Sequence, residues 1–180
     1  MGKEILVSDK LELTKYTQSI YDNLQKSLES IKCVLGKDDC TCIFESFKYD
    51  KIAIDPLTGH PENLIEMVNQ YQTYLVTLKA LEFLFEKHSN KSFVARFGNI
   101  AGYDIESTDG EIVAECFAQV SYKNNKKLDK DLEKLSSITC DVIRYEFFYD
   151  RVFNEDNYVA YKNKYPEINI VKFKTLKDKE

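Results

Sequence analysis

Apolar residues recur every three or four positions along two long stretches of the chain. The first runs from about residue 9 to residue 35 and stops before Gly36, a residue favoured at helix C-termini. Its apolar positions are Leu13, Tyr16, Ile20, Leu24, Leu28, Ile31 and Leu35. The second begins at Pro61, which a first helical turn tolerates because its missing N–H removes no helix bond. Its apolar positions are Leu64, Val68, Tyr71, Leu75, Leu78 and Phe85. The spacing predicts two amphipathic helices.

The segment between these helices, residues 37–60, shows no clear period. It contains a candidate strand at residues 51–55, followed by the turn signal Asp55-Pro56. We therefore expect residues 1–60 to form a helical extension with an irregular segment. Residues 61–180 are expected to form an α/β core, and both parts to belong to one compact domain.

After Ser89-Asn90 the period changes from helical to alternating. Strands are predicted at residues 92–97, 103–106 and 111–120. Asp109-Gly110 is a strong signal for a two-residue hairpin turn, because both positions tolerate positive φ. The strand after the turn has one apolar face and one mixed face, and the mixed face carries Val113, Glu115, Phe117 and Gln119.

The rest of the chain alternates between helix and strand. A helix capped by Asn124 or Asn125 would bury Leu128, Leu132 and Leu135. A strand at 140–149, a helix capped by Asn154 and a strand at 168–173 follow. The predicted fold class is α/β.

The hairpin brings Asp104 and Glu115 together. If the strands pair symmetrically about Asp109-Gly110, the two carboxylates are nearly opposite, with Cβ atoms roughly 5 Å apart. Like charges at that distance are destabilising unless a cation lies between them, and Mg²⁺ commonly binds one or two carboxylates together with waters and phosphate. The pattern favours a divalent-metal site; the alternative is that both carboxylates are solvated and uncoupled.

Glu82 falls on the apolar stripe of the second helix, between Leu78 and Phe85. A carboxylate that faces a core needs a partner, a proton or a metal. The alternative is a residue at the edge of the stripe that pairs with Lys79 or Lys87 and reaches solvent.

Lysines gather after the last strand of the hairpin. Lys123, Lys126 and Lys127 are candidate nucleic-acid contacts, and Lys130 and Lys134 continue the series. Acidic residues are interleaved with them, so they could equally form the solvated face of a helix. The formal net charge of −5 does not by itself indicate nucleic-acid binding, which depends on local positive potential.

Composition narrows the class further. A hydrophobic content of 43% with 12 Tyr and 11 Phe indicates a folded chain, and no apolar run approaches the ~18 residues of a membrane span. We expect no membrane partner, a soluble cytoplasmic protein and five reduced cysteines.

The order helix, three strands, helix, strand over about residues 62–148 resembles the core of the restriction-endonuclease-like, or PD-(D/E)XK, nuclease superfamily. The family motif places Asp on the second strand, then an acidic residue, one spacer and Lys on the third. Asp104 and Glu115 match the acidic positions, and Glu82 matches an acidic residue that many members carry on the preceding helix. The resemblance implies that Asp104 and Glu115 hold Mg²⁺ or Mn²⁺ and that a water is activated to hydrolyse a phosphodiester.

The motif departs at one position, because Phe117 stands where the family has Lys. Phenylalanine can neither orient nor deprotonate a water. A substitute could come from the following helix, the neighbouring strand or the same strand face: Lys123, Lys126 or Lys127, Arg96, or Gln119. Otherwise the site is inactive.

Two functions are therefore expected as alternatives. The first is a metal-dependent DNA endonuclease of the restriction or repair type, with Asp104, Glu115 and Glu82 in its catalytic site. A double-strand cutter of this kind is expected to act as a homodimer. The second is an inactive nuclease-like domain that binds nucleic acid or protein.

Overall fold

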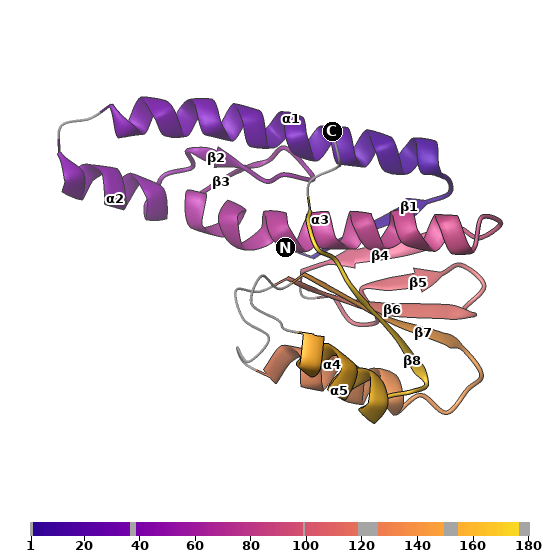
Figure 1. Ribbon diagram of the computed structural model, residues 1–180. Helices are drawn as coiled ribbons and strands as arrows, with labels where there is room; N and C mark the ends of the chain where they lie inside the picture. The colour runs from indigo at the N-terminus through magenta and orange to yellow at the C-terminus, as the bar shows by residue number, and fades with distance from the viewer. Residues whose placement is uncertain (1, 37–38, 99, 119–125, 150–154, 177–180) are drawn as a thin grey trace. The chain divides into compact units, whose positions relative to one another are not determined.

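The computed structural model describes residues 2–36, 39–98, 100–118, 126–149 and 155–176. Within these ranges the chain forms five helices and a six-stranded mixed sheet, so the predicted α/β class is confirmed (Figure 1). The chain divides into two compact units, residues 1–10 with 75–180 and residues 11–74. This division falls within two long helices and not near residue 60.

The first unit is built on the six-stranded sheet. Its strands, in spatial order, are β1 (Lys3–Val7), β4 (Phe93–Phe97), β5 (Ile105–Ser107), β6 (Ile112–Ala118), β7 (Ile143–Tyr149) and β8 (Ile168–Lys172). Neighbours are antiparallel from β1 to β6 and parallel from β6 to β8. Strand β1 was not predicted.

Helices cover both faces of this sheet (Figure 1). On one face lies helix α3 (Leu64–Lys87), whose part from Leu75 onward belongs to this unit. Its Phe83 ring lies 5.5 Å from the ring of Phe147 on β7. On the other face lie α4 (Lys127–Ser136) and α5 (Glu155–Lys164). Each connects two parallel strands, which require a crossover of this kind. The predicted caps Asn124, Asn125 and Asn154 lie outside the described residues.

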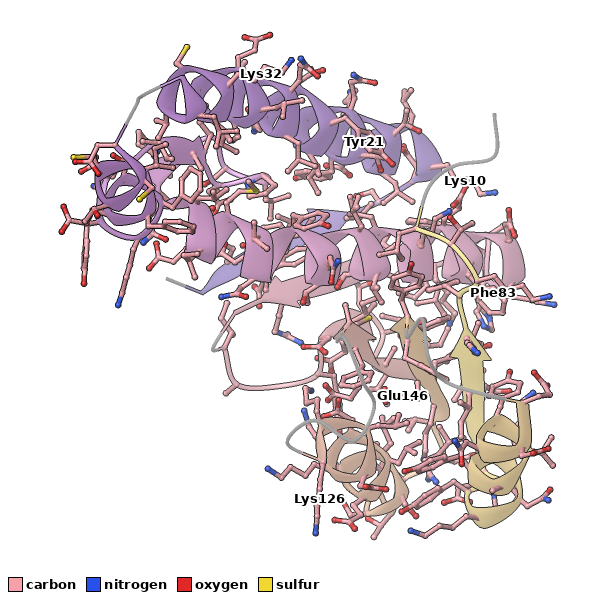
Figure 2. All side chains as sticks on the ribbon, turned by 60° about the vertical axis from the view of Figure 1, so that its left-hand side comes forward. Lys10, Tyr21, Lys32, Phe83, Lys126 and Glu146 are labelled. Carbon is pink, nitrogen blue, oxygen red and sulfur yellow. The ribbon has the colours of Figure 1, made fainter. Side chains whose placement is uncertain are left out.

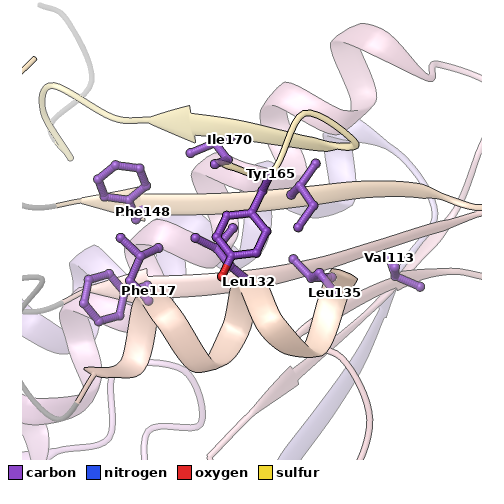
Figure 3. Packing of buried hydrophobic residues seen from close by; sticks show 9 residues of the cluster. Val113, Phe117, Leu132, Leu135, Phe148, Tyr165 and Ile170 are labelled. Atoms are coloured by element: carbon purple, nitrogen blue, oxygen red, sulfur yellow. The ribbon is translucent and has the colours of Figure 1, made fainter. Parts of the chain in front are cut away.

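The face under α4 and α5 carries a continuous apolar cluster (Figure 3). Leu128, Leu132 and Leu135 of α4 are all buried in it, as their spacing predicted. The strands contribute every second residue, as a pleated sheet requires. These residues are Val113, Phe117, Phe148, Ile168 and Ile170.

The second unit contains α1 (Lys10–Leu35) from Leu11 onward, α2 (Cys40–Tyr49), the two-stranded sheet of β2 (Ala53–Ile54) and β3 (Pro61–Glu62), and α3 up to Tyr74. Helix α2 was not predicted; Asp39 caps it by accepting a hydrogen bond from the Thr41 N–H at 2.8 Å. The prediction that Pro61 opens a helix is wrong, because α3 begins at Leu64. Asn63 caps that helix through a 2.9 Å bond from the Glu66 N–H.

The buried stripe of α1 also differs from the prediction. Leu28 and Leu35 are exposed, whereas Ser27 and Val34 are buried. Ser27 is tolerated there because its hydroxyl donates to the carbonyl of Asn23 and accepts a 3.0 Å hydrogen bond from the Ile54 N–H. A polar side chain in the interior thus ties α1 to strand β2.

Candidate functional site

The pairing of β5 with β6 brings Asp104 and Glu115 together. Ile105 pairs with Ala114 and Glu106 with Val113, which is the predicted register. Asp104 lies one residue before β5, where its Oδ2 accepts a 2.8 Å hydrogen bond from the backbone N–H of Cys116. The Asp104 charge also raises the pKa of Glu115, so the two carboxylates are electrostatic neighbours.

The turn that sets this register is wider than predicted. Gly110 has a φ of 74° and its N–H donates to the Ser107 carbonyl at 2.9 Å, whereas Asp109 does not adopt positive φ. The Ser107 hydroxyl donates to Asp109 at 2.7 Å and accepts from the Ile112 N–H at 2.9 Å. The Ser107 hydroxyl therefore takes the place of one backbone hydrogen bond between the strands, and the pairing register is unchanged.

The cation nearest to Glu115 is the ammonium of Lys134, which forms an ion pair with Glu115 Oε1. The same Nζ donates to the Gly102 carbonyl at 2.6 Å and lies 4.8 Å from the centre of the Tyr103 ring. The side chain of Glu115 is 3% exposed and that of Lys134 is 43% exposed. The ammonium of Lys134 therefore offsets the repulsion between Asp104 and Glu115, a role for which the sequence favoured a metal ion.

The pKa of Glu115 is raised to about 8, chiefly by burial and then by the charge of Asp104, while the hydrogen bond from Lys134 acts in the opposite direction. The group therefore changes its charge close to neutral pH. Sequence alone could not reveal this, because the shift depends on burial beneath α4.

Glu146 extends the acidic cluster. It pairs in register with Glu115 across the parallel strands β6 and β7, so both side chains lie on the same face of the sheet. Figure 2 labels Glu146. Glu146 is 0% exposed, and neither of its carboxyl oxygens has a hydrogen-bond partner among the described residues. Burial raises its pKa well above the ordinary value, with nearby Asp131 adding to the shift. Alternation along the predicted strand at residues 140–149 places Glu146 on the face opposite Tyr145 and Phe147, a signal in the sequence that could have identified it.

Helix α4 supplies a second ion pair at the edge of the cluster. Lys127 donates to Oδ1 of Asp131 at 2.6 Å, one helical turn away, and Asp131 is buried. Burial raises the pKa of Asp131 and outweighs the opposing effect of Lys127. Lys127, a predicted phosphate contact, is therefore engaged within the helix. Lys126 is exposed at the start of α4, and Lys123 lies outside the described residues.

The structure also places Phe117 and Glu82, two residues that the motif comparison singled out. Phe117 is 1% exposed and packs in the apolar cluster beneath α4, so the position that carries Lys in the family motif is here a core position (Figure 3). Glu82 is exposed, and the prediction that it lies on the buried stripe is wrong. It belongs to α3, which packs on the face of the sheet opposite α4, and the structure does not bring it to Glu115.

The residues considered as substitutes for the missing lysine were Arg96, Gln119 and the lysines that follow β6. Arg96 donates from Nε to Glu4 at 2.8 Å and from Nη1 to Glu106 at 2.9 Å, so its guanidinium is already engaged by two carboxylates. Gln119 lies outside the described residues. Lys134, which was predicted only as part of a lysine series that either contacts phosphate or faces solvent, is the residue that reaches Glu115.

Within the described part of the chain, no group of three or more His, Cys, Asp or Glu side chains is arranged to hold a metal ion. The same part contains no helix with an apolar stretch long enough to cross a bilayer. No protein-family profile matches the sequence, and no curated protein matches it significantly. A function for this chain can therefore be inferred only from the geometry of its own residues.

Proposed function

We propose that this chain is a metal-dependent nuclease with a restriction-endonuclease-like core, in which Asp104 and Glu115 form the catalytic carboxylate pair. The observation that carries the proposal is the neighbouring position of these two carboxylates at the start of β5 and the middle of β6, with a lysine ammonium on Glu115. An aspartate, a glutamate and a lysine are the side chains that the family motif requires.

The order of the elements supports the same proposal. Helix α3, strands β4, β5 and β6, helix α4 and strand β7 follow one another along the chain. The first three of these strands are antiparallel and the last pair is parallel, with the helices on opposite faces. Fold alone does not fix function, so the site must provide the chemistry.

The donor set fits a hard divalent cation with two protein ligands. Mg²⁺ commonly takes one or two carboxylates and completes its shell with waters and substrate phosphate. Asp104 and Glu115 would hold the ion, which when bound would polarise the phosphate and lower the pKa of a water. The hydrogen bond from the Cys116 N–H orients the Asp104 carboxylate for this role.

Lys134 takes the part that Phe117 cannot. Its side chain reaches Glu115 from helix α4 and not from strand β6. Because it is 43% exposed, it can leave Glu115 for an incoming phosphate when a cation occupies the carboxylates. In this proposal Glu82 has no catalytic role, and Lys134 replaces the lysines considered first.

One observation favours the second function, an inactive nuclease-like domain that binds nucleic acid or protein. Phe117 is part of the packed core, and the ion pairs Lys134–Glu115 and Lys127–Asp131 neutralise charge within the chain. A cluster built to stabilise the fold would use its charges in this way.

Cleavage of supercoiled plasmid and of single-stranded DNA with Mg²⁺, Mn²⁺ or EDTA separates the two functions. We expect metal-dependent cutting that Asp104→Asn and Lys134→Met each abolish. The matched controls are Asp141→Asn, an exposed carboxylate, and Lys130→Met, an exposed lysine of α4; both should cut normally. No cutting, together with no metal-induced rise in the melting temperature, would reject the nuclease and leave the binding domain.

A further inference from the structure

A pocket of about 520 Å³ lies at the β8 edge of the sheet, within the first unit. Helix α3 contributes Phe83 and Lys87, β7 contributes Tyr145, and α5 contributes Tyr158 and Lys162. Figure 2 labels Phe83 on the side where β8 ends. The volume is in the range of small-molecule sites, which is roughly 300–1,000 Å³. The pocket does not include Asp104, Glu115 or Lys134.

The charge of the pocket is opposite to that of the chain. Both charged residues in its lining, Lys87 and Lys162, are cationic, although the whole chain carries a net charge of −5. Within the described residues neither ammonium is paired with a carboxylate; each lies over an aromatic ring. Lys87 Nζ is 5.8 Å from the centre of the Phe83 ring, and Lys162 Nζ is 4.5 Å from that of Tyr158. Two ammonium groups without carboxylate partners select an anion.

Three of the side chains that line the pocket are aromatic: Phe83, Tyr145 and Tyr158. Phe83 and Tyr145 meet edge to face at 6.0 Å, and the Tyr145 hydroxyl is held at 2.9 Å from Nε2 of His88. Asn169, fixed by a 3.1 Å hydrogen bond to the Arg144 carbonyl, adds an amide that can bond the edge of a base. Aromatic side chains accept any base by stacking, which makes them common in nucleotide sites.

We propose that this pocket binds a nucleotide unit, with the base against the aromatic walls and the phosphate contacted by the ammonium groups of Lys87 and Lys162. The ligand is either a free nucleotide or one residue of a single strand, because both present the same base and phosphate. The site is independent of the nuclease chemistry and requires no divalent ion.

Calorimetric titration of the full chain in EDTA tests this site. The probes are AMP, adenosine, inorganic phosphate and a short single-stranded oligonucleotide. AMP should bind at least about tenfold more tightly than adenosine or phosphate, since only AMP satisfies both halves of the site. A tighter oligonucleotide identifies a strand as the source of the nucleotide, and equal affinity identifies a free nucleotide.

Variants locate the binding. Lys87→Ala and Lys162→Ala should each weaken AMP about five- to tenfold, the loss of one charge-assisted hydrogen bond. Lys162→Arg should preserve affinity, and Phe83→Leu should weaken AMP without changing phosphate binding. Lys164→Ala, on the same helix but outside the pocket, is the matched control and should bind as the native chain does.

Three results would overturn the proposal: no binding of any nucleotide probe, equal binding of phosphate and AMP, or an equal loss from Lys164→Ala. Asp104→Asn should bind AMP normally, so failure of the nuclease proposal leaves this test unaffected.

Discussion

Glu115 and Phe117 of β6 make different contacts with helix α4. Glu115 and Phe117 share one face of the strand, and both lie beneath α4. The carboxylate finds its cation on the helix, and the aromatic ring fills the space that a lysine at position 117 would occupy. Helix α4 thus contributes both the lysine that pairs with Glu115 and the leucines that pack around Phe117.

Lysine at position 117 should destabilise the protein. Phe117→Lys would bury an ammonium among leucines and a phenylalanine without a partner, so we expect the free energy of unfolding to fall by roughly 4 kcal/mol or more. Phe117→Leu should cost less than about 1.5 kcal/mol, because the volume is largely conserved. Urea unfolding measures both. A stable Phe117→Lys chain with increased DNA cleavage would show that position 117 can face the site.

Glu146 gives the fold a pH dependence. Its pKa is raised in the folded state, so above pH 4.5 the unfolded chain loses this proton while the folded chain keeps it. The contribution of Glu146 to stability is therefore largest at acidic pH. It falls as pH rises towards the folded pKa, by at most about 1.4 kcal/mol per pH unit for one proton. Glu146→Gln removes this proton from both states, and its stability relative to the native chain should increase with pH.

Urea unfolding of the native chain and Glu146→Gln at pH 5, 6, 7 and 8 measures that difference. Glu111→Gln, a change at an exposed carboxylate, serves as the control and should leave the pH profile unchanged apart from the loss of its ion pair with Lys91. Parallel profiles for the native chain and Glu146→Gln would mean that Glu146 ionises equally in both states.

At the scale of elements, two glycines position the hairpin and the loop before it. Gly110 has φ 74°, and an added Cβ there would meet nothing within 4 Å. Gly102 has φ 116°, and its Cβ would lie 3.2 Å from Nη1 of Arg96. The Gly102 carbonyl also accepts the bond from Lys134. One glycine therefore supports only the turn, while the other supports the candidate site.

Alanine substitution should distinguish these roles. We expect Gly110→Ala to cost about 1 kcal/mol from backbone strain alone. Gly102→Ala should cost roughly 2–3 kcal/mol, because its φ is almost restricted to glycine and Arg96 must also move. Only Gly102→Ala should lower metal-dependent cleavage. Unfolding and plasmid assays compare the two, and equal effects on cleavage would separate the Gly102 loop from catalysis.

The hairpin also illustrates what the sequence could predict. Its register follows from a strict period of two and a turn centred on Asp109-Gly110, and both are local signals. Helix α2 was missed because its exposed Phe44 and Tyr49 give no apolar stripe facing a core. The contact of Lys134 with Glu115 was not predicted, because it spans 19 residues. Contacts that depend on how α4 packs on the sheet produce no periodic pattern in the sequence, so they cannot be predicted from it.

At the scale of the whole molecule, charge decides how DNA could approach. A chain with a net charge of −5 must bind phosphate through local groups that are not already neutralised. At the start of α4 this requirement separates two adjacent lysines. Lys127 is paired with the buried Asp131, whereas Lys126 is exposed. The sequence pattern alone does not distinguish Lys126 from Lys127 as candidate phosphate contacts.

Lys126→Ala and Lys127→Ala should therefore affect DNA binding differently. Each phosphate contact contributes about 0.9 to the slope of log affinity against log salt, so Lys126→Ala should reduce that slope by roughly this amount for all sequences. Lys127→Ala should leave the slope nearly unchanged and instead lower stability, because it leaves the buried Asp131 carboxylate without its cation. Fluorescence anisotropy at several salt concentrations, beside urea unfolding, measures both effects. Equal loss of slope in the two variants would mean that the Lys127–Asp131 pair opens on binding, and no loss in either would place the DNA on another surface.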